Sequence, residues 1–479
     1  MHRIAPGPAQ PLHTVAASRR IESAAAARLA PHTLMERAGL ATARLALAIA
    51  PHAQRWWIAC GLGNNGGDGL EAAMHLQQWG KSVQVSWLTT HEHAPPDTKA
   101  SYARALAAGV QFVAEPPADC DGVIDALLGI GASRAPEDRM ARWIAHINDL
   151  SVPVLAVDLP SGLDADTGHT AGLCVHASHT LSLLTLKPGL CTAYGRDHCG
   201  EIWLDTLGVD ATTTPAQARL NAAPAPQTRP HASHKGSYGD VAVVGGAPGM
   251  GGAALLAARA ALHHGAGRVF VGLLDGADLR LDPAQPELML RPTDGLDPGK
   301  LTIVAGCGGG QAIAAQLPRL LSAAPRLVLD ADALNAIAAD PQLKTQLRSR
   351  ARRQRATVLT PHPLEAARLL GQTTDEIQTD RLSAAQRLAD EFAACVVLKG
   401  SGTVIAAPGM APVINPTGNA RLATAGTGDV LAGLIGARLA QGEQAFEAAC
   451  AAVYLHGQAA DGWPGHRPLT AGELASAVG

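Results

Sequence analysis

The chain has 479 residues, of which 47% are hydrophobic, and this is enough material for two domains with separate cores. Its formal net charge of −3, with acidic and basic residues interspersed, argues against a nucleic-acid or membrane partner. No uninterrupted apolar run is long enough to cross a membrane, and the start of the sequence lacks the apolar core of a secretory signal. The eight cysteines show neither Cys-x-x-Cys pairs nor zinc spacing with histidine, so we expect a cytoplasmic protein with reduced thiols.

Short apolar runs alternate with segments of helical pattern in the first half of the chain. The runs that read as strands are 55–60, 82–88, 122–128 and 153–159. Strands that alternate with helices at this spacing are typical of a parallel, doubly wound α/β sheet. Ligands of such sheets bind at the carboxyl ends of the strands, where we therefore expect a site.

A glycine-rich loop, Cys60-Gly-Leu-Gly-Asn-Asn-Gly-Gly-Asp-Gly69, follows the first of these runs. Its glycines match the spacing of a dinucleotide fingerprint. The next run, however, ends in Trp87-Leu-Thr-Thr90, without the acidic residue that binds a ribose in ordinary dinucleotide domains. We expect the loop to bind phosphate in a different geometry, and a tight strand–helix turn without a ligand is the alternative.

Polar side chains also stand at the ends of the later runs. Asp125 closes the third run, and Asp158 closes the fourth and is followed by Ser161. Together with Asn65 of the glycine loop, they would meet in one crevice, and their oxygen atoms suit a hard cation. Two buried carboxylates near one another need a cation or a proton. Loop capping by each aspartate is the alternative.

Residues 210–230 are rich in Ala, Pro and Thr and show no hydrophobic periodicity, which is typical of a linker. We therefore predict a first domain over 1–210, a linker over 211–229 and a second domain over 230–479. The second half repeats the α/β pattern, with strand-like runs at 240–244, 268–272, 301–305, 326–329, 357–359 and 394–398. It contains neither a P-loop nor a protein-kinase signature.

The segment Thr424-Ala-Gly-Thr-Gly-Asp-Val-Leu-Ala-Gly433 combines a glycine turn with the start of a helical run. Free amides and the helix dipole make such a helix N-terminus an anion site. A carboxylate beside it, Asp429, is a poor anion ligand but a good base for a hydroxyl that is about to be phosphorylated. A helix N-cap is the alternative role for Asp429.

The first half resembles the N-terminal epimerase domain of the NAD(P)H-hydrate repair enzymes, over roughly residues 10–210. The resemblance rests on Leu34-Met-Glu-Arg-Ala-Gly39, Gly63-Asn-Asn-Gly-Gly-Asp-Gly69, Asp125-Ala-Leu-Leu-Gly129 and Asp158-Leu-Pro-Ser-Gly162. It implies a Rossmann-like three-layer sandwich, a K⁺ ion held by Asn65, Asp125 and Ser161, and Asp158 as the proton-transfer group. The residues that it places against the hydrated cofactor are Asn64, Asn65, Gly66, Gly67, Asp68, Gly129, Ile130, Gly131, Ala132, Ser133, Arg134, Ala135 and Asp158.

The second half resembles the dehydratase domain of the same enzymes, over roughly residues 228–479, which implies a ribokinase-like fold. Asp330-Ala-Asp-Ala-Leu-Asn335 and Gly426-Thr-Gly-Asp-Val-Leu-Ala-Gly433 carry the resemblance. It implies nucleotide binding by Lys399, Gly400, Ser401, Gly402, Thr403 and Gly428, and it places Ala253, Gly308, His362 and the catalytic Asp429 on the substrate side. Two positions depart from the family pattern: Cys307 stands where proline is common, and Leu364 where glycine is common. For His362, a packed loop histidine is the alternative.

Both halves in this order imply a bifunctional enzyme that epimerises NADHX and NADPHX and dehydrates the S form at the expense of ADP. The resemblance also implies Mg²⁺ on the phosphates and a homo-oligomer. A small-molecule kinase with a nucleotide-binding first domain is the rival enzyme class. A nucleotide-sensing module with silent sites is the rival outside enzymes, and the presence of Asp125, Asp158 and Asp429 weakens it.

Overall fold

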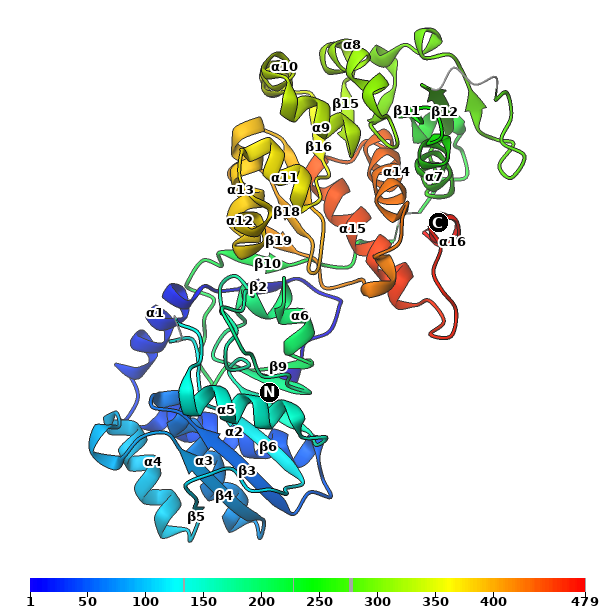
Figure 1. The fold of residues 1–479 in the computed structure, drawn as a ribbon. Coiled ribbons are helices and arrows are strands. Elements are labelled where there is room, and N and C mark those ends of the chain that lie inside the picture. Colours follow the sequence, from blue (N-terminus) through cyan, green and yellow to red (C-terminus); the bar gives the residue numbers. More distant parts are fainter. Residues whose placement is uncertain (132–133, 227, 275–278, 479) are drawn as a thin grey trace. The chain divides into compact units, whose positions relative to one another are not determined.

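The computed structural model describes residues 1–131, 134–226, 228–274 and 279–478. The chain forms two compact units: Met1–Ala5 with Gln10–Ala218, and Pro6–Ala9 with Arg219–Gly479. Both units are built on predominantly parallel sheets with helices between the strands, so the predicted α/β fold class is confirmed (Figure 1).

The sheet of the first unit has the order β1-β9-β8-β7-β6-β3-β4-β5, and neighbouring strands are parallel except β1 and β9. Its strands are β1 (His2–Arg3), β3 (Arg55–Cys60), β4 (Ser82–Trp87), β5 (Gln111–Phe112), β6 (Gly122–Ala126), β7 (Val154–Val157), β8 (His179–Leu183) and β9 (Glu201–Asp205). The short strand β2 (Gln10–Leu12) also belongs to this unit. The four predicted strands are confirmed, and the runs around β6 and β7 are shorter than expected because their last residues belong to loops.

Helices cover both faces of this sheet. They are α1 (Val15–Ala26), α2 (Thr33–Ile49), α3 (Asn64–Gln78), α4 (Pro96–Ala107), α5 (Asp138–Asp149) and α6 (Gly195–His198), with 3₁₀ turns η1 (His91–His93) and η2 (Pro188–Cys191). Alternate residues of β3 point to opposite faces. Trp56 and Ile58 join the core formed with α2, α3 and α4, whereas Trp57 and Ala59 join the core formed with α5. The unit is therefore a three-layer sandwich.

In the second unit the strand order is β13-β12-β11-β14-β15-β16-β17-β18-β19-β10. The strands are β10 (Ala218–Leu220), β11 (Asp240–Gly245), β12 (Arg268–Leu273), β13 (Met289–Leu290), β14 (Thr302–Ala305), β15 (Arg326–Leu329), β16 (Ala356–Leu359), β17 (Cys395–Leu398), β18 (Val404–Ala406) and β19 (Val413–Ile414). The pairs from β13 through β17 are parallel, and β18 is antiparallel to both neighbours. All six strands predicted in this half are present within one residue of their expected ends.

Two helical layers cover this second sheet as well. The helices are α7 (Gly251–His263), α8 (Leu317–Ala323), α9 (Asp332–Ala339), α10 (Pro341–Arg352), α11 (Pro363–Leu370), α12 (Thr374–Thr379), α13 (Arg381–Phe392), α14 (Thr427–Ala440), α15 (Ala445–Asp461) and α16 (Ala471–Ala477). The 3₁₀ turns are η3 (Lys235–Tyr238), η4 (Thr293–Gly295), η5 (Pro298–Lys300), η6 (Gln311–Ala315) and η7 (Ala420–Leu422). Val241 and Val243 of β11 pack with α7, α14 and α15, and Ala242 and Val244 pack on the opposite face with α8 and α9.

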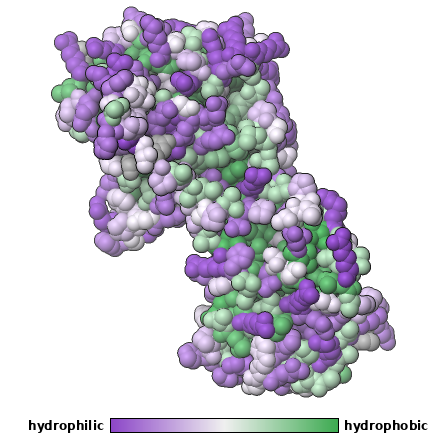
Figure 2. Space-filling model, turned by 180° about the vertical axis from the view of Figure 1, so that it is seen from behind, coloured by the Kyte–Doolittle hydropathy of each residue, from purple (hydrophilic) through white to green (hydrophobic). Residues whose placement is uncertain are grey.

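The segment expected to be a linker contains the strand β10, which pairs in parallel with β19. Its three residues are buried, exposed and buried in turn, a pattern too short to register as a period in the sequence. On the face shown in Figure 2, hydrophilic and apolar residues both occur on each unit. Among the described residues, no helix has the length and apolar character that a membrane-crossing segment needs.

Candidate active sites

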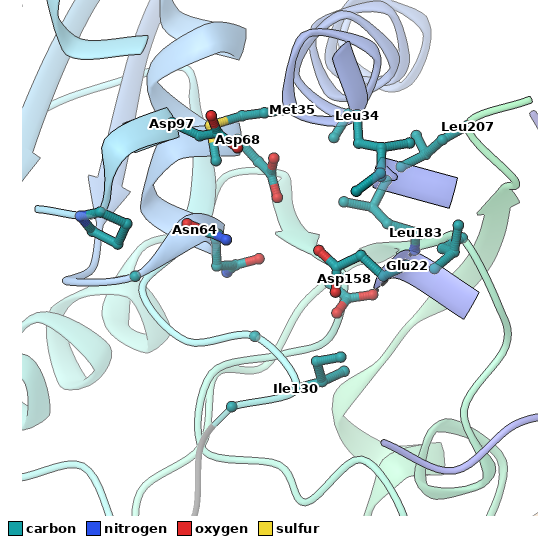
Figure 3. Close-up of a pocket in the computed structure, with 18 of the residues that line it drawn as sticks. Glu22, Leu34, Met35, Asn64, Asp68, Asp97, Ile130, Asp158, Leu183 and Leu207 are labelled. Atoms are coloured by element: carbon teal, nitrogen blue, oxygen red, sulfur yellow. Dashed lines mark hydrogen bonds between the residues drawn. The ribbon is translucent and has the colours of Figure 1, made fainter. Parts of the chain in front are cut away.

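The first unit contains a cavity of about 720 Å³ (Figure 3). Helices α1, α2 and α3 and the loops that follow β3, β6 and β7 line it. Of the predicted substrate-binding residues, the cavity is lined by Asn64, Asn65, Asp68, Gly129, Ile130, Gly131 and Asp158. Gly66, Gly67, Arg134 and Ala135 are described but are not among its lining residues, and Ala132 and Ser133 lie outside the described residues.

The glycine loop presents a helix N-terminus to this cavity. Helix α3 begins at Asn64, and its N-cap, Gly63, supplies no side-chain hydrogen bond to the amides of the first turn. A Cβ at Gly61 would lie 1.7 Å from the Leu127 carbonyl oxygen, and one at Gly66 would lie 2.4 Å from the Gly61 oxygen. These glycines therefore allow the loops after β3 and β6 to pack closely, while the uncapped amides can bind an anion.

The three predicted potassium ligands lie close to the end of β6: Asp125 belongs to this strand, and Asn65 and Ser161 contact the loop that follows it. Asp125 is fully buried and accepts hydrogen bonds from the Ser161 amide at 2.8 Å and the Ser161 hydroxyl at 2.6 Å. The Ser161 hydroxyl oxygen accepts from the Leu128 amide at 2.8 Å. A Cβ at Gly129 would lie 3.1 Å from the Asn65 Oδ1 atom. Burial raises the pKa of Asp125 to about 6, although its hydrogen bonds lower the pKa. The net rise shows that these hydrogen bonds do not fully compensate the buried negative charge.

Asp158 has a left-handed backbone, with φ of 68°, in a loop that holds its carboxylate against a buried lysine. The Lys187 ammonium donates to Asp158 Oδ1 and to the Leu183 carbonyl at 2.7 Å, and the side chain of Lys187 is 1% exposed. The Leu183 amide also donates to Asp158 Oδ1, at 3.1 Å. Asp158 and Lys187 therefore form an ion pair that was not predicted from the sequence, because 29 residues separate them.

Two further carboxylates, Glu22 and Asp68, point into this cavity toward Asp158 (Figure 3). Burial and the neighbouring carboxylates raise the pKa of Asp68 well above its usual value. Burial and the charge of Asp158 also raise the pKa of Glu22, although Lys187 and Arg19 act against this rise. Glu22 was not predicted; the signal that could have found it is the helical spacing that sets it one turn after Ser18, on the face of α1 that lines the cavity.

In the second unit, four polar side chains stand at the carboxyl ends of consecutive strands. Cys307 follows β14, Asp330 follows β15, Thr360 follows β16 and Lys399 follows β17. The Thr360 hydroxyl donates to Asp330 Oδ1 at 2.7 Å, and the Lys399 ammonium donates to the same oxygen at 2.6 Å. Asp330 and Thr360 are buried, so this edge of the sheet carries a preorganised polar network.

Helix α14 directs its N-terminus at this network. Its N-cap is Gly426, with φ of 91°, and no side chain caps the helix, so Asp429 lies in the first turn and is not the N-cap. A Cβ at Gly428 would lie 3.3 Å from the Lys399 Nζ atom. Burial and the charge of Asp330 raise the pKa of Asp429 to about 6, which leaves it mostly ionised at neutral pH and able to accept a proton.

The predicted nucleotide loop follows Lys399. Gly400 has φ of 139°, and the buried Arg381 packs beneath it and donates to the carbonyl oxygen of Lys399 at 3.1 Å. Burial lowers the pKa of Lys399, but the carboxylates of Asp330 and Glu365 raise it more, so the ammonium stays charged. The Thr403 hydroxyl closes the loop by donating to the Gly400 carbonyl at 3.1 Å. A charged lysine beside an uncapped helix suits a phosphate chain.

His362 is the N-cap of helix α11. Its Nδ1 atom accepts from the amides of Leu364 at 3.1 Å and Glu365 at 3.3 Å, and the Glu365 carboxylate accepts from the His362 amide at 2.7 Å. Leu364 therefore takes an ordinary place in the first turn of α11, where glycine is not required, and the residue is 44% exposed. His362 thus caps the helix, a role that the sequence analysis did not consider, and its side chain is 45% exposed.

The remaining substrate-side residues are Ala253, near the start of α7, and Gly308, in the loop after β14. A Cβ at Gly308 would lie 2.7 Å from the Met250 carbonyl oxygen and 2.9 Å from the Ala253 side chain, so Gly308 and Ala253 are in contact. Cys307, next to Gly308, is fully buried and has its thiol within 4.8 Å of carboxylate oxygens of Asp330 and Asp429. The site is therefore formed by residues of helices α7 and α14 and of the two loops that follow β14 and β15.

Comparison with known proteins matches both units. The family model described as "YjeF-related protein N-terminus" matches residues 31–189, and the model described as "NAD(P)H-hydrate dehydratase" matches residues 241–477. The bifunctional NAD(P)H-hydrate repair enzyme of Escherichia coli (strain K12) is 37% identical over 458 residues, which cover 92% of this chain and 87% of the relative. The corresponding enzyme of Leishmania braziliensis is 36% identical over 475 residues, covering 89% of this chain and 84% of its own.

Among solved structures, the ADP/ATP-dependent NAD(P)H-hydrate dehydratase of Bacillus subtilis, co-crystallised with ATP and Mg²⁺, is 33% identical with a TM-score of 0.46. It covers 53% of this chain and 92% of its own. The two family models match successive parts of this chain, and the alignment with the Escherichia coli enzyme covers 92% of it. The chain therefore belongs to the family of bifunctional NAD(P)H-hydrate repair enzymes.

Proposed function

We propose that this chain repairs hydrated nicotinamide cofactors. The first unit interconverts the R and S epimers of NADHX and NADPHX. The second unit dehydrates the S epimer with ADP, giving the reduced cofactor, AMP and phosphate. The observation that best supports this proposal is the position of Asp429. Its largely ionised carboxylate lies in the first turn of an uncapped helix, and the charged Lys399 lies beside that helix.

In the dehydratase reaction, Asp429 takes the proton of the ring hydroxyl while that oxygen attacks the terminal phosphoryl group of ADP, and AMP leaves. The uncapped amides of α14 and the Lys399 ammonium stabilise the charge on the transferred group. The carbon–oxygen bond then breaks with assistance from the ring nitrogen, phosphate leaves, and loss of a ring proton restores the double bond. Hydroxide is a poor leaving group and phosphate is a good one, which is why the transfer comes first.

Mg²⁺ on the phosphates would neutralise charge on the departing nucleotide, and it is commonly bound through one or two carboxylates together with phosphate oxygens. Asp330 fits such a role. Its Oδ1 atom accepts from Thr360 and Lys399, and within the described residues no hydrogen bond reaches its second oxygen. Asp330 then positions Lys399 with one oxygen and can contact the ion with the other.

Potassium fits the oxygen atoms of Asn65, Asp125 and Ser161. Asp125 is a fully buried carboxylate whose hydrogen-bond donors within the described part of the chain are all neutral, and a cation beside it would stabilise its ionised form. Asn65 and Ser161 meet the same loop, at Gly129 and Leu128 respectively. The ion would tie the loops after β3, β6 and β7 together around the cavity.

Epimerisation can proceed by loss of the hydroxyl oxygen and its return on the opposite face of the ring, or by opening and reclosing of the carbon–nitrogen bond, and in either route protons are given to and taken from that oxygen. Asp158 performs this transfer, and the Lys187 ammonium holds its carboxylate in place. The uncapped amides of α3, at Asn64 and Asn65, bind the cofactor phosphates. The resemblance further predicts a homo-oligomer, which light scattering would test, and the cysteine pattern predicts a cytoplasmic protein, which cell fractionation would test.

The function is tested by mixing the purified protein with an equilibrated NADHX epimer mixture, Mg²⁺, K⁺ and either ADP or ATP. Absorbance of the restored dihydronicotinamide is followed together with phosphate release. We expect complete recovery with ADP in a single phase. Recovery that stalls partway would contradict the epimerase role of the first unit, and a stable phosphoester without phosphate release would instead identify a small-molecule kinase.

A further inference from the structure

Helix α1 is fixed against the loop that carries Lys187. A hydrogen bond of 2.7 Å joins the hydroxyl groups of Ser18 and Thr185. Both residues are buried, and Thr185 precedes Lys187 by two positions in the chain. Glu22 follows Ser18 by four residues, so the two side chains share one face of the helix. The bond between Ser18 and Thr185 therefore sets the rotation of α1 that brings Glu22 into the lining of the cavity.

Glu22 and Asp158 face one another inside this cavity, and their carboxyl groups point toward each other (Figure 3). Glu22 is exposed there, so a ligand in the cavity can reach it. The Lys187 ammonium is bonded to Asp158. Within the described parts of the chain, no hydrogen bond or ion pair reaches the Glu22 carboxylate. The two neighbouring carboxyl groups therefore differ in that Asp158 is in contact with a cation and Glu22 is not.

The surroundings of Glu22 favour its protonated form. The other titratable and charged groups that line the cavity are Arg19 on α1, His32 at the start of α2, Asp68 on α3, Asp97 on α4, Asp158 after β7 and Lys187 after β8. The cavity walls remove part of the water around Glu22 and so raise its pKa, and the charge of Asp158 raises it further. Lys187 and Arg19 lower this pKa, but the net shift is upward. Two carboxyl groups whose environments differ in this way are typical of an acid and a base that act together.

We propose that Glu22 is a second proton-transfer group of the epimerase site, which gives a proton to the departing group of the substrate while Asp158 acts as the base. The proposal rests on the proposed epimerase function of the first unit. It divides the two directions of proton transfer between two side chains, one on α1 and one after β7. The asymmetry comes from Lys187, which is in contact with the base.

The proton transfers balance in both routes of epimerisation. If oxygen leaves, Glu22 protonates the hydroxyl, the carbon–oxygen bond breaks with its electrons on oxygen, and water and a ring cation result. The water then adds to the opposite face, Asp158 takes its proton, and proton exchange between the two carboxyl groups restores the site. If the ring opens, Asp158 takes the hydroxyl proton while the carbon–nitrogen bond breaks, and Glu22 protonates the nitrogen. Reclosure on the opposite face reverses both transfers.

The test follows conversion of the purified R epimer to the S epimer by chromatography, with the full chain and K⁺ but without ADP, so that dehydration does not occur. Glu22→Gln keeps the size and polarity of the side chain but has no proton to transfer, and Glu22→Asp keeps a carboxyl group with a shorter reach. Ser23→Ala is the matched control, because Ser23 is the next residue of α1, is exposed and does not line the cavity.

We expect Glu22→Gln to lower kcat about 10²-fold or more with little change in KM, the usual worth of a positioned acid. Glu22→Asp should keep part of the activity and Ser23→Ala all of it. Equal urea midpoints of tryptophan fluorescence would show that the first unit is folded in each variant. A Glu22→Gln enzyme as active as the wild type would overturn the proposal. A raised KM with unchanged kcat would also overturn it, because that pattern indicates a binding residue.

The epimerase function itself is separated from this proposal by the wild type. A wild type that does not convert the R epimer would contradict the proposed function, and the role of Glu22 would fall with it. A readout independent of activity is the infrared band of a protonated carboxyl group, taken as the difference between wild type and Glu22→Gln over a series of pH values. We expect Asp158→Asn to move the titration of this band to lower pH, because the negative neighbour that raises the pKa of Glu22 is gone. An unmoved titration would refute the coupling of the two carboxyl groups.

Discussion

Replacement of Lys187 by Met would leave the Asp158 carboxylate buried without its cation. Lys187 is 1% exposed and the Asp158 side chain 11%, so little water can replace the lost ammonium. Removing one partner of a buried ion pair costs about 3–5 kcal/mol, because the remaining charge is uncompensated. The substitution also removes the hydrogen bond to the Leu183 carbonyl at 2.7 Å. We therefore expect Lys187→Met to destabilise the first unit by about 3–5 kcal/mol and to abolish epimerisation.

The double variant Asp158→Asn/Lys187→Met removes both charges and should recover most of the lost stability, though not the activity. Tryptophan fluorescence suits this measurement, because all the tryptophans except Trp463 lie in the first unit. Urea unfolding curves of the wild type, both variants and the control Lys99→Met, whose lysine forms no ion pair among the described residues, would give the midpoints. A single variant that loses less than about 1 kcal/mol, or a double variant no more stable than the single one, would refute the buried-pair reasoning.

Four further predictions concern the two activities. Asp429→Asn should lower dehydration about 10²- to 10⁴-fold, the usual worth of a general base, while calorimetry should find nucleotide binding nearly unchanged; full turnover would refute the base assignment. Since the pKa of Asp429 in the free protein is raised to about 6, kcat/KM of the dehydratase should fall as the pH drops through 6, and a kcat/KM that stays flat down to pH 5 would contradict this. Asp158→Ala should consume about half of an epimer mixture promptly and the rest at the spontaneous rate, so single-phase consumption would count against Asp158. Exchanging K⁺ for a large organic cation should slow epimerisation, measured by chromatography of the epimers, and leave dehydration of the S epimer unaffected; equal slowing of both would argue against the Asp125 site.

Much of the fold was predictable because parallel strands buried on both faces are continuous apolar runs. The runs at 55–60 and 326–329 match β3 and β15 residue for residue. The strand β10 was not predicted, because its three residues are too few to show a hydrophobic period and the strand is fixed by its pairing with β19.

The candidate sites were predictable where a polar residue directly follows an apolar run, as at Asp125 and Asp158, because strand ends converge at one edge of a sheet. Lys187 and Glu22 could not be found in this way. Lys187 follows β8 inside a loop, and its role depends on a contact with Asp158 across the fold. Glu22 lies on α1, before the first strand of the α/β pattern, and the packing of α1 against the cavity is a property of the tertiary structure alone.

The most direct test of the repair function starts from the purified R epimer of NADHX with ADP, Mg²⁺ and K⁺, because recovery from this epimer needs both units in sequence. Dihydronicotinamide absorbance, AMP and phosphate are measured together over time. We predict full recovery much faster than spontaneous epimerisation, with one AMP and one phosphate formed for each cofactor restored. Recovery at the spontaneous rate only, or consumption of ADP with a lasting phosphoester in place of phosphate, would contradict it.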